Sequence, residues 1–264
     1  MSRAIADRHD HACALAGRAG AAALGFFERR ETLAVETKAT AQDVVSHADR
    51  AIEALIREQI TAAFPDDAIL GEEGAPRPGT SGFTWVIDPI DGTMPFLSGL
   101  AHWCVAIAVL QSGRTVAAAT HAPRLGLICE AKEGGGFRCN GETRIVSTEL
   151  GITDAMTAIG ASHRTTPVAI GEVITRLLQA GGAYYRSGSG AMMLAEVAAG
   201  NLAGYYEPHM HPWDCLGGLL MIREAGGCIA PFDARRMLAQ GERVLVAAPA
   251  AFSALSDIVG PASD

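Results

Sequence analysis

Residues 85–93 place two carboxylates directly after a short run typical of a buried strand, and this stretch constrains the fold more than any other. It reads Trp-Val-Ile-Asp-Pro-Ile-Asp-Gly-Thr: the bulky, mostly β-branched residues favour a strand, and the rest predicts a turn that opens a helix. Pro89 restricts its own φ and keeps Asp88 out of the helical region, so the chain bends between the two acids. We therefore expect Asp88 and Asp91 to face one point, with the Ile90 carbonyl turned inward beside them.

Two carboxylates held together repel each other unless a cation lies between them. Hard oxygen ligands of this kind suit Mg²⁺ or Mn²⁺ better than zinc. Gly92 and Thr93 would add backbone N–H groups and a hydroxyl at a helix N-terminus, which attracts anions. The same residues also fit a plain turn in which Asp caps the helix, so local chemistry alone leaves both interpretations open.

Length and composition describe a globular protein with room for a large core. The chain has 264 residues, of which 49% are hydrophobic and 19% charged; this size is near the upper limit for one domain and also fits two lobes. No run approaches the ~18 apolar residues of a membrane span, and the N-terminus is too polar for a secretory signal. We therefore expect a soluble, cytoplasmic protein with no membrane partner.

Charge and cysteine content argue against two further classes of protein. The formal net charge of −8 disfavours nonspecific nucleic-acid binding, because that needs a basic surface to displace counterions. A phosphorylated small molecule stays compatible if metal ions reverse the local field. The six cysteines form no CxxC pair, so no zinc ribbon is indicated and reduced, buried thiols are expected.

Periodicity predicts both helices and strands in the first half of the chain. Residues 3–29 form an Ala-rich amphipathic pattern, although three glycines interrupt it, and residues 32–38 alternate like a strand. Ser46 followed by Asp49 matches a capping box that opens a helix extending to Phe64. Further strands are predicted at 68–70, 102–110, 115–122 and 125–131, the last three joined by hairpin turns, with two short strands near 133–141.

The second half alternates strand and helix. We place the junction of two lobes near residue 148, so that a single domain, 1–264, comprises an N-terminal lobe of about 1–148 and a C-terminal lobe of about 149–264. Strands are predicted at 155–159, 183–185, 204–206 and 244–247, and helices near 170–178, 191–199, 213–224 and 250–258.

Acidic residues stand at the ends of several predicted elements. Glu72 follows the strand at 68–70 between glycines, and Asp214 lies at a helix start, where it also fits an ordinary role complementing the helix dipole. Together with Asp88 and Asp91 they form the inventory of a two-metal phosphate site, in which the ions stabilise charge on the transferred phosphoryl group.

These residues resemble the signatures of a known family. Gly71-Glu72-Glu73, the stretch 85–93, Trp213-Asp214 and the Glu-Ala-Gly-Gly run at 224–227 resemble the inositol monophosphatase family of Mg²⁺-dependent, lithium-sensitive phosphatases. The Asp-Pro-Ile-Asp-Gly-Thr element is highly specific, and the order and spacing of the others extend the match from about residue 38 to about residue 227. The resemblance implies a layered αβαβα fold of the α/β (α+β) class and a homodimer.

The resemblance also implies roles for individual residues around two or three Mg²⁺ ions, for which Mn²⁺ could substitute. Glu72, Asp88 and the Ile90 carbonyl resemble ligands of the first ion, and Asp88, Asp91 and Asp214 those of the second. Thr93 with Glu72 resembles the pair that orients the attacking water, and Asp91 is counted with them as catalytic. Lys38 and Asp49 match mobile-loop positions that support a further ion. Substrate contacts are implied for Asp88, Asp91, Gly92, Thr93, Ser189, Gly190, Glu207 and Asp214.

Departures from the family pattern bear on the substrate. Met94-Pro95-Phe96 stands where the family commonly continues Thr-Asn-Phe, and Leu202-Ala203-Gly204 stands where an acid often precedes Tyr-Tyr-Glu. A polyol phosphate such as inositol monophosphate is the first expectation, histidinol phosphate the second, and another sugar or nucleotide phosphate the third. A noncatalytic, metal-dependent protein that binds a phosphate ligand is the alternative outside the enzymes.

Two other residue pairs allow different chemistry. His209 and His211 could ligate zinc, although no third nitrogen ligand stands nearby in the sequence and a role lining the pocket fits better. Ser162 and His163 could act as nucleophile and base, but adjacent side chains seldom aim at each other and no Gly-x-Ser-x-Gly elbow surrounds them. Phosphate contact is the better interpretation of that loop and of the Gly-Ser-Gly run at 188–190.

Overall fold

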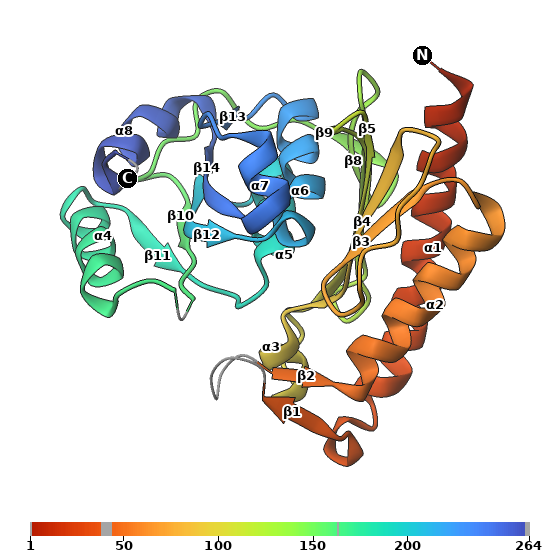
Figure 1. Cartoon of the computed structure of the whole chain (residues 1–264). Helices are drawn as coiled ribbons and strands as arrows, with labels where there is room; N and C mark the ends of the chain where they lie inside the picture. The colour runs from red at the N-terminus through yellow and green to blue at the C-terminus, as the bar shows by residue number, and fades with distance from the viewer. Residues whose placement is uncertain (1, 38–43, 163, 262–264) are drawn as a thin grey trace.

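Alternating layers of helix and sheet make up the fold, as the layered αβαβα expectation requires (Figure 1). The computed structural model describes residues 2–37, 44–162 and 164–261. One outer layer is formed by α1 (Arg3–Phe27) and α2 (His47–Ala63), on the right in Figure 1. The predicted fold class, a mixed α/β protein of this layered type, is confirmed.

The first sheet carries the stretch that organises the chain. Its strands in the described residues are β3 (Ala68–Gly71), β4 (Phe83–Asp91), β5 (Cys104–Gln111), β6 (Arg114–Ala122), β7 (Leu127–Lys132), β8 (Gly136–Cys139) and β9 (Glu142–Arg144). They lie side by side in chain order. The β3–β4 pair is parallel and the others are antiparallel, so the predicted hairpins are confirmed.

The first helix is continuous in spite of its glycines. It packs over β5 and β6, while α2 packs over β4. A Cβ at Gly20 would lie 2.2 Å from Nδ1 of His121 on β6, so this glycine permits close approach to the sheet. Among the helices of the described residues, including this one of 25 residues, none is long and apolar enough to cross a membrane.

The segment before α2 differs from its prediction as one strand over 32–38. A 3₁₀ turn, η1 (Arg30–Thr32), comes first, and the strand β1 (Val35–Thr37) is shorter than expected. The Thr32 hydroxyl donates to the Arg29 carbonyl at 2.8 Å, which closes the turn and removes this residue from the extended run. β1 pairs antiparallel with β2 (Val44–Ser46).

The second sheet is built by the second half of the chain. Its strands in the described residues are β10 (Met156–Ile159), β11 (Ala183–Tyr185), β12 (Gly204–Met210), β13 (Cys228–Ile229) and β14 (Glu242–Ala247). Their order is β11-β10-β12-β14-β13, with β10 parallel to both of its neighbours and β14 antiparallel to both of its own. The outer face is covered by α4 (Pro167–Gln179) and α8 (Pro249–Val259), on the left in Figure 1.

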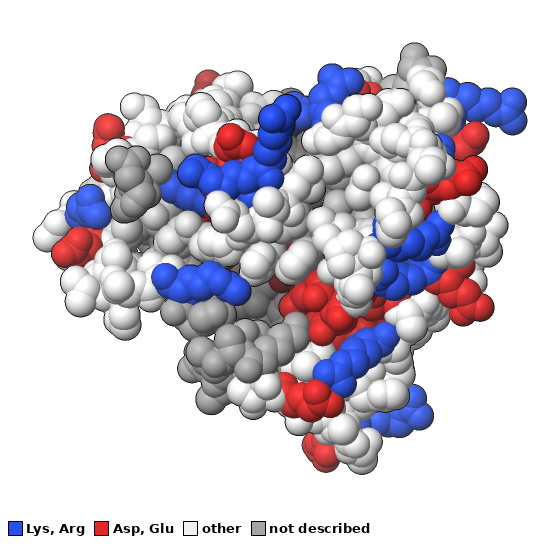
Figure 2. Space-filling view, in the orientation of Figure 1, with Lys and Arg blue, Asp and Glu red and all other residues white. Residues whose placement is uncertain are grey.

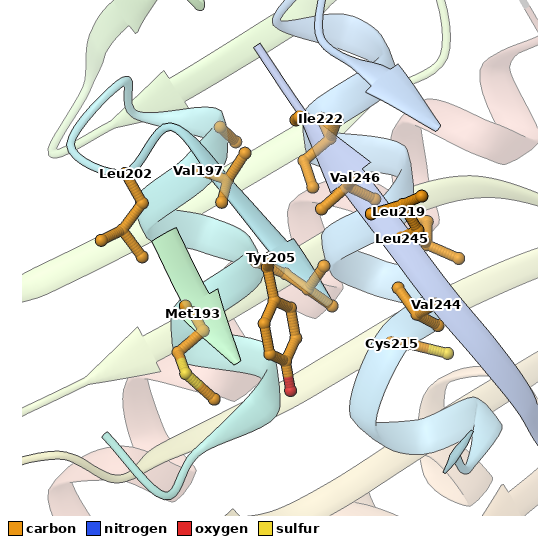
Figure 3. Packing of buried hydrophobic residues seen from close by; sticks show 14 of the residues in the cluster. Met193, Val197, Leu202, Tyr205, Cys215, Leu219, Ile222, Val244, Leu245 and Val246 are labelled. Atoms are coloured by element: carbon orange, nitrogen blue, oxygen red, sulfur yellow. The ribbon is translucent and has the colours of Figure 1, made fainter. Parts of the chain in front are cut away.

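Two helices fill the space between the sheets. α5 (Gly190–Ala198) and α6 (Pro212–Glu224) are buried on most sides. Figure 3 shows Met193 of α5 and Leu219 of α6 in the cluster that contains Tyr205 of β12 and Val246 of β14. The same cluster includes Val86 of the first sheet, so apolar packing continues across the middle layer from one sheet to the other.

Three features of the second half were not predicted. They are the helix α7 (Ala234–Gln240), the two-residue strand β13 and the continuation of β12 to Met210. Each has a weak sequence signal, because short elements carry little periodicity. The start of α7 is set locally, since the Asp233 side chain accepts hydrogen bonds from the N–H groups of Arg235 and Arg236 at 2.8 and 2.9 Å.

The first sheet ends at Arg144 and the second begins at Met156. The division of one domain into lobes near residue 148 falls between these points and stays a prediction. The predicted short helix after the organising stretch is present as α3 (Thr93–Leu97).

Candidate metal centre

An extra residue in β4 brings Asp88 and Asp91 to the same side of the sheet. Side chains alternate along a strand, so residues three apart would normally point to opposite faces. Asp88 pairs with Ala106 of β5 and Asp91 with Cys104, so three steps along β4 match two along β5. Pro89 lies in this β-bulge, where a missing N–H does not interrupt the ladder. The strand therefore runs on to Asp91, past the turn that the sequence placed after Ile87.

A third carboxylate joins them from the first turn of α6. One oxygen from each of Asp88, Asp91 and Asp214 lies within 4.8 Å of the others. Asp214 is oriented by its own helix, because its Oδ2 accepts a hydrogen bond from the His211 N–H at 3.0 Å. The structure brings these three acids together, as expected from the sequence.

The three acids are costly to ionise together. Burial raises the pKa of Asp88 well above its usual value, and the charges of Glu72, Asp91 and Asp214 raise it further. Burial also raises the pKa of Asp214, and the negative charges of Asp91 and Glu72 raise it further. A divalent cation among these oxygens would remove the repulsion, and a donor set of oxygens alone fits Mg²⁺ or Mn²⁺. The residues present therefore fit such an ion.

Glu72 lies in the loop after β3, next to the end of β4. Its N–H donates to the Ile87 carbonyl at 3.3 Å, and its charge acts on both Asp88 and Asp214 as above. The loop is held by Glu53 of α2, which is buried and accepts the N–H groups of Glu73 and Gly74, each at 2.8 Å. Glu53 was not among the predicted site residues, because its burial on α2 depends on tertiary contacts.

Asp91 is bound by the N-terminus of α5. Its Oδ2 accepts the Ser189 hydroxyl and, at 2.7 Å, the Ala191 N–H, and its Oδ1 accepts the Gly190 N–H at 3.3 Å. Burial raises the pKa of Asp91, although these hydrogen bonds act in the opposite direction. Ser189 and Gly190 were expected to contact substrate; that role stays a prediction, and the contacts found here are to Asp91.

Thr93 is joined to Asp49 of α2. The Thr93 hydroxyl lies 3.0 Å from Asp49 Oδ1 and 3.2 Å from the Ile90 carbonyl oxygen. Asp49 is fully buried, and its Oδ2 accepts the Ser46 N–H at 2.8 Å as well as the Ser46 hydroxyl. The predicted capping box is therefore confirmed, and Asp49 reaches the site as well. Lys38, predicted to act with Asp49, lies outside the described residues.

Gly92 lets the chain pass from β4 into α3. Its φ of 91° is in the left-handed region, and a Cβ there would lie 2.9 Å from the His102 carbonyl oxygen. A side chain at this position would be strained and would also clash. Gly92 was predicted at a helix start, and it is the N-cap residue of α3.

A pocket opens beside the acids toward the second sheet. Asp91 and Asp214 form one side, and Gly160, Arg186 and Glu207 are among the other residues that line it. A Cβ on Gly160 would lie 2.1 Å from Glu207 Oε2, so the glycine leaves room for that carboxylate. The sequence identified Glu207 but missed Gly160 and Arg186, which lie in loops far away in the chain.

Glu207 has an unusual protonation equilibrium. Burial raises its pKa to about 7, although a hydrogen bond from Tyr205 and the charge of Arg186 lower it. The Tyr205 hydroxyl donates to Glu207 Oε2. At neutral pH the carboxyl group can therefore be present in both its protonated and its ionised form.

The alternative zinc pair, His209 and His211, lies with ring centroids 5.0 Å apart, but each ring also has another contact. His209 Nε2 lies 2.8 Å from the Gln240 carbonyl oxygen, and the His211 ring stacks on Trp213 with centroids 4.8 Å apart. In the described part of the chain, neither histidine belongs to a group of three residues with metal-binding geometry. His163 of the other alternative pair lies outside the described residues.

Acidic side chains gather near the centre of the face shown in Figure 2. Figure 1, in the same orientation, places the lower ends of β3 and β4 there. The acidic centre, formed by Asp88, Asp91 and Asp214, is open to a small ligand through the pocket that Asp91 and Asp214 line.

The chain is similar to known proteins over most of its length. A sequence profile described as the inositol monophosphatase family matches residues 6–259. An inositol-1-monophosphatase of Rhizobium meliloti is 36% identical over 214 residues, 80% of each chain. A Nus factor SuhB of Haemophilus influenzae is 32% identical over 235 residues, 88% of each. The solved structure of an IMPase from Thermotoga maritima is similar with a TM-score of 0.85, at 28% identity and over 96% of each chain.

Proposed function

The chain belongs to the inositol monophosphatase family, and from this premise we propose that it is a Mg²⁺-dependent phosphomonoesterase that hydrolyses a small polyol phosphate such as inositol monophosphate. One observation carries the proposal: the oxygens of Asp88, Asp91 and Asp214 converge within 4.8 Å. The family depends on metal, and this buried acidic group is suited to hold it.

Two or three ions would be held by Glu72, Asp88, the Ile90 carbonyl, Asp91 and Asp214, and Mn²⁺ could replace Mg²⁺. When bound, the ions would act as Lewis acids that polarise the phosphate ester and stabilise the charge that develops on it. The N–H groups of Gly92 and Thr93 remain the proposed phosphate donors.

Thr93 and Asp49 supply a route for a proton. With its hydroxyl proton donated to Asp49 Oδ1, the Thr93 oxygen has lone pairs free to accept a proton from the attacking water. The Thr93 proton can then pass to the carboxylate. We propose that Glu72 orients the same water together with Thr93, as the resemblance implies.

The pocket around Glu207 favours a neutral polyol over a cationic substrate. A carboxyl group with a pKa of about 7 can both accept and donate hydrogen bonds, as sugar hydroxyls require. Arg186 lines the same pocket, and its positive charge would oppose an ammonium or imidazolium group. Histidinol phosphate therefore ranks after a polyol phosphate. Other sugar or nucleotide phosphates rank third.

A phosphate-release screen tests the proposal. Inositol monophosphates, histidinol phosphate, sugar phosphates and 3′-phosphoadenosine 5′-phosphate are each supplied with Mg²⁺ and with EDTA. We expect Mg²⁺-dependent release that is fastest from an inositol monophosphate. Phosphate release that is equally fast with EDTA would refute the metal mechanism. Tight ligand binding without any phosphate release would support the noncatalytic alternative.

Glu207→Gln ranks the two leading substrates. The amide still accepts a hydrogen bond, so kcat/KM for a polyol phosphate should fall modestly, whereas that for histidinol phosphate should fall much more because a charge partner is lost. Glu172→Gln, on the exposed face of α4, is the matched control and should leave both unchanged. No effect on either substrate would remove Glu207 from the substrate site.

We also propose a cytoplasmic homodimer that binds no nucleic acid and is inhibited by Li⁺ at the second metal position. The resemblance and the net charge of −8 support these points. Sedimentation gives the oligomeric state, and Li⁺ titration of the phosphatase reaction should give uncompetitive inhibition. Some relatives are named Nus factor SuhB; nucleic-acid binding is measured in the same preparation, and none is expected.

A further inference from the structure

A second group of metal-binding side chains lies between α1 and β7. His9 and Cys13 are one helical turn apart on α1, and Glu130 comes from β7. Their ligand atoms all lie within 4.8 Å of one another. Figure 1 places the N-terminal end of α1 at the opposite end of the first sheet from α3, so this group is separate from the acidic centre.

The spacing of the three ligand atoms fits a tetrahedral ion. Usual Zn–S, Zn–N and Zn–O bond lengths require ligand atoms roughly 3.3–3.6 Å apart. Cys13 Sγ lies 3.6 Å from His9 Nε2 and 3.0 Å from Glu130 Oε2, and the latter two atoms are 4.0 Å apart. The S–O distance would have to lengthen and the N–O distance to shorten by roughly 0.6 Å each, with the fourth position open to water.

The other ring nitrogen of His9, Nδ1, contacts a carboxylate, as is common for histidines that bind metal. Nδ1 lies 3.2 Å from Asp10 Oδ1, an arrangement that orients the ring and leaves Nε2 for an ion. The His9 side chain is 11% exposed and that of Glu130 is 25% exposed, so the group is largely enclosed but can be reached from solvent. Among the charges that act on the Cys13 thiol, Lys132 lowers its pKa, and Glu130 and Asp10 raise it.

We propose that His9, Cys13 and Glu130 form a Zn²⁺ site that ties the first helix to the first sheet. One nitrogen, one sulfur and one oxygen donor select Zn²⁺ over Mg²⁺. In the metal-free protein the Cys13 thiol donates to Glu130. On binding, the S–H bond breaks, an S–Zn bond forms and the proton leaves to the buffer.

Other thiols must be separated from this site in the experiment. The Cys129 and Cys139 sulfurs are 3.5 Å apart, and Cys104 Sγ is 3.8 Å from Asp91. Zn²⁺ content is therefore measured by equilibrium dialysis with Mg²⁺ in excess, for the parent, Cys13→Ala and His9→Ala. Cys129→Ala and Cys104→Ala are the matched controls. Cd²⁺ replaces Zn²⁺ in a second series, in which the ultraviolet thiolate-to-metal band is recorded.

One Zn²⁺ per chain is expected in the parent and in both controls. His9→Ala and Cys13→Ala should weaken its binding by more than about 100-fold, and Asp10→Asn by about 10–100-fold. The Cd²⁺ band should be lost in Cys13→Ala alone among the cysteine variants. Equal Zn²⁺ content in all variants, or a band lost only with Cys129→Ala or Cys104→Ala, would overturn the proposal.

Glu130→Gln guards against misfolding as the explanation. The amide keeps an acceptor for the Cys13 thiol, so far-UV circular dichroism and phosphate release should match the parent while Zn²⁺ affinity falls. Parent-like affinity in this variant would also overturn the site. Because the readout is Zn²⁺ binding, failure here leaves the proposed phosphatase function untouched.

Discussion

The hydroxyl of Thr93, the first residue of α3, lies 3.0 Å from the carboxylate of Asp49 in the first turn of α2. The other Asp49 oxygen completes the capping box with Ser46. One buried carboxylate therefore closes the start of a helix and orients a hydroxyl beside the acidic centre.

Removal of the Thr93 hydroxyl should impair catalysis more than folding. Thr93→Val keeps the shape of the side chain, and kcat/KM should fall about 10²–10⁴-fold if the hydroxyl takes part in proton transfer. Asp49→Asn should have a similar effect and should also destabilise the protein by about 0.5–2 kcal/mol through the weakened cap. If the two residues act together, the double variant will be little slower than either single variant. Parent-like kcat/KM in Thr93→Val would contradict this pairing.

Mg²⁺ should stabilise the protein increasingly as the pH rises. The pKa of Asp88 is raised by burial and by neighbouring carboxylates, so its contribution to stability is fully present below its unfolded pKa of about 3.9 and is lost as the pH rises through the folded pKa. The melting temperature in EDTA should therefore fall with rising pH, and Mg²⁺ should restore it. Asp88→Asn should flatten both dependences; an identical pH profile would sink the explanation.

Ser189→Ala should affect both stability and activity. The hydroxyl donates to Asp91 and also caps α5 by accepting the Met192 N–H at 3.3 Å. Its loss leaves Asp91 short of a buried donor and should cost about 1–3 kcal/mol. Thr166→Ala, which removes the cap of α4 and lies on the surface, is the control. Chemical denaturation and kcat measure the two effects, and kcat should fall only in Ser189→Ala.

A buried ion pair under α1 should dominate the acid sensitivity of the first helix. Arg8 Nη2 lies 2.7 Å from Asp67 Oδ1, with side chains 11% and 1% exposed. Burial alone would raise the pKa of Asp67, but hydrogen bonds from Arg8, Ser81 and Trp85 leave it below the ordinary value. Asp67→Asn leaves the guanidinium unpaired and should cost about 3–5 kcal/mol.

The stability lost in Asp67→Asn should depend on pH in one direction. A depressed pKa means that the stability is present above the unfolded pKa of about 3.9 and disappears as the pH falls through the folded pKa. The difference between the parent and Asp67→Asn should therefore shrink only in strong acid. Glu36→Gln removes an exposed partner of Arg50 and should not change the melting temperature. A difference that is constant with pH would contradict the role of the charge.

Local sequence determined many elements of this fold. The capping box of Ser46 and Asp49, the hairpins between β5, β6 and β7, and the helix that starts after Gly92 were all predicted, because each depends on contacts within a few residues. The acids at the strand and helix ends were found for the same reason, as was the family resemblance. These features are encoded in side-chain periodicity and turn chemistry.

Tertiary structure decided the further contacts of these residues and the backbone geometry that brings the acids together. The contact of Asp91 with Ser189 joins residues 98 apart and that of Thr93 with Asp49 joins residues 44 apart. The bulge in β4, which turns Asp88 and Asp91 to one side, exists only against its partner strand β5. Arg186 and Gly160 reach the Glu207 pocket from separate loops. Such pairings depend on how the layers pack, because burial and long-range register are properties of the whole sheet and not of any one stretch.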